Sequence, residues 1–191
     1  LYTNLKIKII RNLPSKNFLN PKPINIKKIL CINEGDNILL YQGKLHEGRG
    51  LRFVIECMAK MDDVVLVLIG DGPMKAKYIE VATKYKVGNK IFFIDAIPYQ
   101  QLGQFSAGAY IGLSIIQPIS KSYEHALPNK LFEYAVTGIP SICSNLTAMQ
   151  EVVDNYKFGI AIDPKNKTEF VEAYEKIKQQ YQNYVIGQKR R

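Results

Sequence analysis

The segment from Gly43 to Gly50, GKLHEGRG, places two cationic side chains, Lys44 and Arg49, among glycines. Glycines let a backbone approach a ligand closely, and the start of a helix attracts anions. The segment is not a P-loop, GxxxxGK[ST], because arginine replaces the lysine and glycine replaces the hydroxyl residue that would hold Mg²⁺. It also lacks GxGxxG, which disfavours a standard dinucleotide site. The pattern predicts an anion site; a glycine turn with two solvated cations is the alternative.

A second candidate site follows Pro128, where a helix is predicted to begin. A proline in the first helical turn leaves the amides of Asn129, Lys130 and Leu131 unpaired, and these amides attract a phosphate together with the helix dipole. Glu133, one turn into the helix, is placed to accept hydrogen bonds from hydroxyl groups, as acidic residues do when they hold a ribose. An anion site beside a carboxylate indicates a nucleoside diphosphate. A surface helix with ordinary capping and a solvated glutamate is the alternative.

The elements that must position these groups alternate along the chain. Apolar runs predict six strands, at residues 38–41, 64–69, 91–94, 110–115, 141–143 and 159–162. The predicted helices include one with Tyr78, Ile79, Ala82 and Tyr85 on one face, and a last one striped by Phe170, Tyr174, Ile177 and Tyr181. Continuously apolar strands that alternate with helices indicate an α/β fold with a doubly wound parallel sheet. Ligands of such sheets bind beyond the carboxyl ends of the strands, where both candidate segments lie.

Composition restricts the class of protein. The chain has 191 residues, of which 47% are hydrophobic and 23% charged, as in soluble globular proteins, and its apolar runs are too short to span a bilayer. Three cysteines and two histidines are scattered along it. This disfavours disulfide scaffolds and zinc fingers and indicates a reducing compartment, the cytoplasm.

The net charge of +9 is concentrated at the two ends of the chain. Residues 1–33 hold seven basic and no acidic side chains, and residues 189–191 are all basic, whereas the remainder has 16 basic and 17 acidic side chains. With a neutral body and no aromatic-rich basic motif, nucleic-acid binding is not expected. The basic ends are interpreted either as a contact with anionic lipid at the inner face of the membrane or as a solvated surface.

The chain begins with leucine, and no signal-peptide pattern follows, so it is expected to be a piece of a longer protein. Pro14, Pro21 and Pro23 mark a predicted linker. Residues 1–23 are therefore predicted to be the end of a missing N-terminal domain with its linker. Residues 24–191 are predicted to form one domain.

Four segments stand in order in the region from about residue 37 to residue 183: LLYQGKLHEGRGL, VVLVLIGDGP, IFFIDAIPYQQL and LPNKLFEYAVTGIPSICSN. Together they resemble the C-terminal, nucleotide-sugar-binding half of a glycosyltransferase with the GT-B fold, of the large retaining family 4 (group 1) type. The resemblance implies that Lys44 and Arg49 bind the donor diphosphate. It also implies that Glu133 binds the ribose and that the backbone of Ile97 contacts the base.

The chain departs from the family pattern at one position. Glu133 matches the second of two glutamates separated by seven residues, and the first falls at His125, with Glu124 beside it. The resemblance implies that either Glu124 or His125 lies near the donor sugar as a candidate catalytic residue; a solvated loop histidine is the alternative. Pro128 also stands five residues before Glu133 rather than three.

The function implied by the resemblance is that of the donor-binding domain of a glycosyltransferase. Such an enzyme moves a sugar from a nucleoside diphosphate to a saccharide or lipid-linked acceptor with retention, here in the synthesis of cell-surface polysaccharide. No metal or other cofactor is expected, and the aspartates form no DxD. Without the missing acceptor domain the chain is expected to bind donor but not to transfer sugar. A nucleotide-sugar epimerase of the same fold and a non-catalytic nucleotide-binding module remain alternatives.

Overall fold

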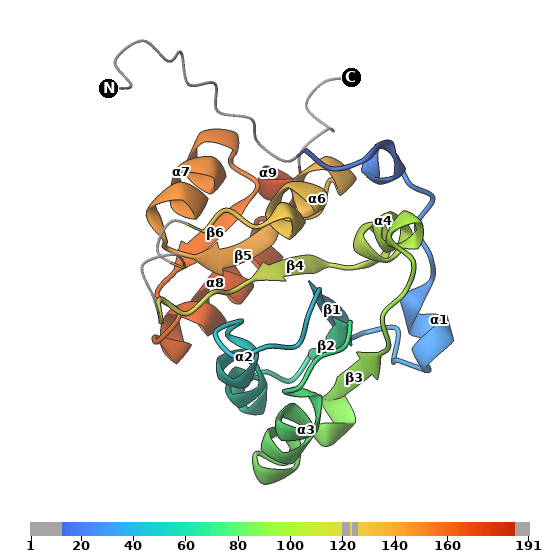
Figure 1. The fold of residues 1–191 in the computed structure, drawn as a ribbon, viewed down its shortest axis with the longest axis vertical. Helices are drawn as coiled ribbons and strands as arrows, with labels where there is room; N and C mark the ends of the chain where they lie inside the picture. Colours follow the sequence, from blue (N-terminus) through green and yellow to red (C-terminus); the bar gives the residue numbers. More distant parts are fainter. Residues whose placement is uncertain (1–12, 120–122, 124–125, 186–191) are drawn as a thin grey trace, which may run out of the picture.

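The computed structural model describes residues 13–119, 123 and 126–185 (Figure 1). The strands are β1 (Asn37–Gln42), β2 (Val64–Ile69), β3 (Ile91–Ile94), β4 (Ile111–Ser114), β5 (Ser141–Ser144) and β6 (Gly159–Ile162). The helices are α1 (Ile26–Leu30), α2 (Leu51–Cys57), α3 (Lys75–Lys84), α4 (Tyr99–Gly108), α6 (Asn129–Thr137), α7 (Thr147–Tyr156), α8 (Lys167–Gln179) and α9 (Tyr181–Tyr184). Short 3₁₀ turns are η1 (Lys16–Phe18), η2 (Met58–Lys60) and η3 (Gly88–Lys90).

The strands form one parallel six-stranded sheet in the order β3-β2-β1-β4-β5-β6. β1 and β2 pair over their full length, with Asn37 opposite Val64 and Gln42 opposite Ile69. The chain winds outward from β1 to β3 on one side and from β4 to β6 on the other, so the winding direction reverses between β1 and β4. The predicted doubly wound sheet is confirmed, and ligands of such sheets bind where the winding reverses.

Helices cover both faces of the sheet because its central strands are apolar on both sides; all six residues of β2 are buried. α2, α3 and α8 pack on one face through a cluster that includes Leu66 and Phe170. α1, α4 and α6 pack on the other face around Leu40 and Phe105, and α7 extends that layer. Figure 1 shows α4, α6 and α7 above the sheet and α2 and α3 below it.

The predicted inner face of α3 is partly wrong. Tyr78 and Ala82 are buried as expected, but Ile79 is 46% exposed, and Val81 packs inward instead. At 3.6 residues per turn, positions 78, 81 and 82 share one face, whereas position 79 is rotated by about 100° from position 78. Ile79 is apolar but lies beside the buried stripe rather than in it.

The apolar stripe predicted for the last helix is wrong at its fourth residue. Phe170, Tyr174 and Ile177 are buried in α8 as expected. Tyr181 lies beyond the end of α8, in α9, where its ring stacks on that of Tyr110 with 4.4 Å between ring centres. Gln180 has a non-helical backbone, with φ of -124° and ψ of 31°, and it separates the two helices, so one continuous helix was the wrong prediction.

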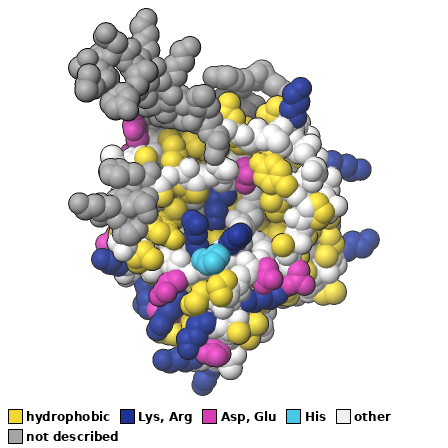
Figure 2. Space-filling view, in the orientation of Figure 1, with side chains coloured by type: hydrophobic (Ala, Val, Ile, Leu, Met, Phe, Trp, Pro, Cys, Tyr) yellow, Lys and Arg dark blue, Asp and Glu magenta, His cyan; other side chains and the backbone are white. Residues whose placement is uncertain are grey.

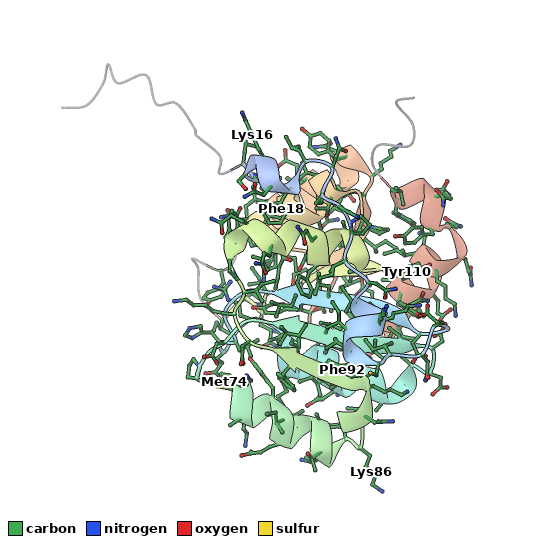
Figure 3. The ribbon with its side chains drawn as sticks, turned by 90° about the vertical axis from the view of Figure 1, so that its right-hand side faces the viewer. Lys16, Phe18, Met74, Lys86, Phe92 and Tyr110 are labelled. Atoms are coloured by element: carbon green, nitrogen blue, oxygen red, sulfur yellow. The ribbon has the colours of Figure 1, made fainter. Side chains whose placement is uncertain are left out.

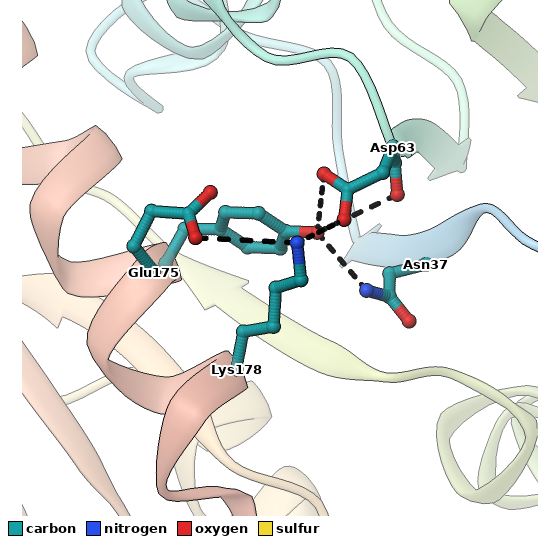
Figure 4. A network of polar contacts seen from close by, with 5 residues as sticks. Asn37, Asp63, Glu175 and Lys178 are labelled. Atoms are coloured by element: carbon teal, nitrogen blue, oxygen red, sulfur yellow. Dashed lines mark hydrogen bonds and ion pairs between the residues drawn. The ribbon is translucent and has the colours of Figure 1, made fainter.

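A polar network connects α8 to the amino ends of β1 and β2, at the opposite end of the strands from the candidate site (Figure 4). The Tyr174 hydroxyl accepts a hydrogen bond from Asn37 Nδ2 at 3.0 Å and donates one to Asp63 Oδ1 at 3.2 Å. Lys178 pairs with the same carboxylate and lowers the pKa of Asp63. This network fixes the helix on the sheet and belongs to the scaffold.

Close packing at Gly112 fixes α6 over the centre of the sheet. A Cβ at Gly112 would lie 2.3 Å from the ring of Tyr134, so the helix approaches β4 as closely as a glycine permits. The Tyr134 hydroxyl donates to the carbonyl oxygen of Leu40 in β1 at 3.2 Å. α6 therefore spans β1 and β4, and its first turn lies where the winding of the sheet reverses.

The described part of the predicted linker packs on the domain. Phe18 in η1 is fully buried and contacts the first residue of α4, Tyr99 (Figure 3). Residues 1–12 and 186–191 lie outside the described residues, and the division at residue 23 stays a prediction. Among the described residues there is no helix with the length and apolar character needed to cross a membrane.

Candidate functional site

The glycine loop after β1 is held by backbone contacts on its inner side. Leu45 is fully buried, and its amide donates to the carbonyl oxygen of Asp71 at 2.9 Å. The Tyr41 hydroxyl donates to the carbonyl oxygen of Lys44 at 2.8 Å. Gly50 caps α2 with a φ of 66°, and a Cβ there would lie 2.3 Å from Ile115. The glycines thus serve the turn itself, while Lys44 stays exposed at the rim and Arg49 is half-buried.

Two of the predicted segments meet in one pocket of about 320 Å³ at the carboxyl end of β1 and the start of α6. Its lining includes six predicted site residues: Gly43, Lys44, Arg49, Asn129, Lys130 and Glu133. Tyr41, Gln42, Tyr99, Leu102 and Pro128 complete it. Figure 2 shows Lys and Arg side chains gathered in the middle of this face of the molecule.

Glu133 is the acidic member of this pocket, and it is only 4% exposed. Its Oε2 accepts a hydrogen bond from Gln42 Nε2 at 2.6 Å, and its Oε1 accepts one from the Tyr99 hydroxyl at 3.0 Å. Ser106 Oγ donates in turn to Gln42 Oε1 at 2.8 Å. The alternative of a solvated glutamate on a surface helix is wrong, because the carboxylate is buried and held by donors from two other elements.

Three cations, Lys44, Arg49 and Lys130, line the pocket. Lys130 Nζ lies 3.5 Å from the centre of the Tyr41 ring. Burial, and next the positive charge of Arg49, hold the pKa of Lys130 well below its ordinary value, while Glu133 opposes this shift. Crowded positive charges disfavour one another, so an anion placed between them would relieve the repulsion.

One predicted donor at the start of α6 is wrong. The amide of Leu131 is not unpaired; it donates to the carbonyl oxygen of Pro128 at 3.1 Å, and the Leu131 side chain is buried in the core. The reason is that Pro128 is the extended N-cap of α6 rather than its first helical residue, so its carbonyl accepts the first bond of the helix. Asn129 and Lys130 do line the pocket.

The residue predicted to contact the base, Ile97, lies in an adjoining pocket. Ile97 lines a second pocket of about 270 Å³, which shares Gly43, Lys44 and Leu102 with the first. Ile69 and Ala96 add apolar surface to it. A planar, mostly apolar group bound there would lie directly beside the cations and Glu133.

The two predicted catalytic residues, Glu124 and His125, lie outside the described residues. Within the part of the chain that the structure describes, no three His, Cys, Asp or Glu side chains gather as they would around a metal ion. Three residues that shape the pocket were missed: Gln42, Tyr99 and Ser106. Only Gln42 had a signal in the sequence, as a polar residue that ends an otherwise apolar strand.

Comparison with known proteins gives the family. The profile of the family described as glycosyl transferases group 1 matches residues 24–189. The chain belongs to this family. A curated relative, described as the uncharacterized glycosyltransferase MJ1607 of Methanocaldococcus jannaschii, is 22% identical over 148 residues, which are 75% of this chain and 36% of that protein. The chain thus spans about a third of the length of this relative.

Solved structures show the same fold. WaaG, a glycosyltransferase involved in lipopolysaccharide biosynthesis, aligns with a TM-score of 0.76 at 18% identity, over 93% of this chain and 48% of WaaG. HepE of Anabaena, solved with UDP and glucose, aligns at 0.74 and 16% identity over 93% and 48%. The C-terminal domain of the group 1 glycosyltransferase LpcC from Francisella tularensis aligns at 0.71 and 15% identity over 93% of both chains. The fold is that of the C-terminal domain of GT-B glycosyltransferases.

Proposed function

We propose that this chain is the donor-binding domain of a glycosyltransferase that transfers a sugar from a nucleoside diphosphate to an acceptor with retention of configuration. The observation that carries the proposal is the pocket that Lys44, Arg49 and Lys130 line together with Glu133 at the carboxyl end of β1 and the start of α6. The cations suit the anionic phosphates of a nucleoside diphosphate, and the carboxylate suits the neutral diol of its ribose.

The diphosphate is assigned to the cationic side of the pocket. In transfer of a glycosyl group the bond between the sugar and the diphosphate breaks, and negative charge grows on the departing phosphate oxygen. Cations fixed in a partly buried pocket stabilise that charge more than they stabilise the intact donor, and only this difference accelerates the reaction. Lys44 and Arg49 are the proposed side-chain partners, with the first amides of α6, at Asn129 and Lys130, beside them.

The ribose is assigned to Glu133 and the base to the pocket at Ile97. A carboxylate has about four acceptor positions, and two protein donors already occupy one on each oxygen of Glu133. The remaining positions suit the two hydroxyls of a ribose. Glu124 and His125 are proposed to lie near the donor sugar.

The acceptor is proposed to be a saccharide or a lipid-linked saccharide of the cell surface. WaaG, involved in lipopolysaccharide biosynthesis, and WaaB, a lipopolysaccharide outer core galactosyltransferase, share the fold and support this class. A cytoplasmic reaction at the inner face of the membrane fits the three free cysteines and the basic ends of the chain. An acceptor domain is proposed to complete the enzyme, because the described residues form one sheet, and GT-B enzymes hold the acceptor across a cleft from it.

Binding tests the proposal first. The chain is titrated by calorimetry with UDP, GDP and ADP and with the three matching nucleosides. One diphosphate should bind at least about tenfold more tightly than its nucleoside, since charge-assisted contacts contribute about 1.5 kcal/mol or more each. Nucleosides that bind as tightly as diphosphates would refute the assignment.

Product analysis separates transfer from the alternatives. The chain is incubated with the matching sugar nucleotide, with and without a saccharide and lipid extract. We expect donor binding without acceptor-dependent release of diphosphate, because holding the acceptor in place supplies up to ~7 to 11 kcal/mol of the barrier reduction. Acceptor-dependent release at ordinary enzyme rates would contradict the missing-domain proposal, and conversion of the sugar without acceptor would identify an epimerase.

A further inference from the structure

The carboxylate of Glu133 is held by a side chain that comes from the start of a different helix. Tyr99 is the first residue of α4, and its hydroxyl donates to Glu133 Oε1 at 3.0 Å. The other oxygen is fixed by Gln42, which Ser106 fixes in turn. Each carboxylate oxygen therefore has one protein donor, and the direction of its remaining lone pair is set by that donor.

Tyr99 is itself supported by the segment upstream of α1. Its ring lies 5.2 Å from the ring of the fully buried Phe18, centre to centre, with an angle of 51° between the planes. Burial and the nearby Glu133 raise the pKa of the Tyr99 hydroxyl. Phe18 thus supports the ring of Tyr99, while the hydroxyl of the same side chain donates to Glu133.

A second contact shows how closely this upstream segment sits on α4. A Cβ at Gly103 would lie 2.5 Å from the carbonyl oxygen of Asn17, one turn along the helix from Tyr99. The backbone of η1 therefore rests directly on the backbone of α4, where any side chain at position 103 would push it away. Figure 3 shows Phe18 between η1 and the helix beneath it.

We propose that Tyr99 is a positioning residue for Glu133, and that residues 16–18 hold Tyr99 in place, so that this segment upstream of α1 sets the affinity for the ribose of the donor. This inference rests on the proposed role of Glu133 as the ribose acceptor. Without the Tyr99 hydroxyl the terminal torsion of Glu133, which is broad and roughly two-fold, is no longer fixed at both oxygens. A diol that needs two aligned acceptors then loses more than a sugar that needs one.

The test uses Tyr99→Phe, which removes the hydroxyl and keeps the ring against Phe18. The probes are UDP, GDP and ADP, each paired with its 2′-deoxy counterpart, and the pair that binds most tightly is titrated by calorimetry. We expect the variant to lose about 3- to 10-fold in affinity for the ribonucleotide and less than twofold for the deoxyribonucleotide. The ratio of the two affinities therefore shrinks, which a general loss of structure would not produce.

Two further variants complete the experiment. Phe18→Leu fills most of the same space and should lower the ratio in the same direction, with thermal unfolding measured to show that the domain stays folded. Tyr156→Phe, at an exposed tyrosine of α7, is the matched control and should leave the ratio unchanged. An unchanged ratio in folded Phe18→Leu overturns the role of the upstream segment.

Glu133→Gln distinguishes this inference from the function on which it rests. If Glu133→Gln abolishes the preference for the ribonucleotide while Tyr99→Phe keeps it, Tyr99 does not position the carboxylate, and the inference fails while the proposed function stands. If the parent chain binds none of the diphosphates, or Glu133→Gln keeps the preference, the assignment of the ribose to Glu133 fails and the inference falls with it. Loss of the preference in both variants supports the inference.

Discussion

Removal of the Arg49 guanidinium is the most direct single test of the diphosphate site. Arg49 lines the pocket together with Lys44 and Lys130. A hydrogen bond to a charged group contributes about 1.5 to 3 kcal/mol, so Arg49→Ala should weaken binding of a nucleoside diphosphate by roughly 10- to 150-fold. Binding of the nucleoside alone should change far less, because its ribose and base are assigned to Glu133 and to the pocket at Ile97.

Features of the free protein place the loss in the lower part of that range. Lys44 and Lys130 stay in the pocket when Arg49 is removed, and they compensate for part of the lost attraction for the diphosphate. The cation of Arg49 also lies 5.7 Å from the centre of the Tyr123 ring, a contact whose loss affects stability more than binding. We expect a net loss of about 1.5 to 2 kcal/mol, or roughly 10- to 30-fold.

The assay is calorimetric titration with UDP and uridine, or with the matching pair for the preferred base. The control is Lys77→Ala, which removes an exposed cation paired with Glu80 on α3. The parent should lose affinity for the diphosphate as salt is raised, and Arg49→Ala should lose less, because one screened charge is gone. Equal losses for diphosphate and nucleoside, or an effect no larger than that of the control, would refute the phosphate assignment.

Two further predictions concern the scaffold. Gly112→Ala should lower the free energy of unfolding by about 1 to 3 kcal/mol, because the added methyl group would lie 2.3 Å from the ring of Tyr134. Urea unfolding measures this loss, and Gly88→Ala is the control, because nothing lies within 4 Å of a Cβ there. An equal effect of the two substitutions would contradict the packing argument. Asp63→Asn should destabilise the fold by less than about 1 kcal/mol at pH 7. Because Lys178 lowers the pKa of Asp63 from 3.8, the carboxylate stabilises the fold above that pH and the effect is lost as pH falls through the lowered pKa; a difference between parent and variant that does not shrink in acid would show another origin.

The sequence by itself determined the strands. Val64–Ile69, Ile91–Ile94 and Gly159–Ile162 lie at the positions that their apolar runs predict, and the other strands are shifted by a residue or so at their ends. A buried parallel strand must be apolar on both faces, so its position is written in consecutive residues. The order of the four segments was likewise enough to indicate the family, which the match over residues 24–189 confirms.

Local spacing was weaker at the ends and faces of helices. Ile79 and Tyr181 fit an apolar stripe in the sequence but lie off the buried face or beyond the helix. The first residue of α6 depended on the backbone conformation of Pro128, and with it the pairing of the Leu131 amide. These details depend on how each helix packs on the sheet, and the sequence of a helix is compatible with more than one such packing.

The partners of Glu133 were decided by the tertiary structure alone. Gln42 stands 91 residues before Glu133 in the chain and Tyr99 34 residues before it, yet both donate hydrogen bonds to its carboxylate. No spacing within a single helix or strand predicts these pairs. They form because the sheet places β1 beside β4, and because α4 and α6 then pack side by side on the same face. The hydrophobic pattern is local and determines the helices and strands. The donors that orient a buried carboxylate depend on strand order, which no single segment of the sequence determines.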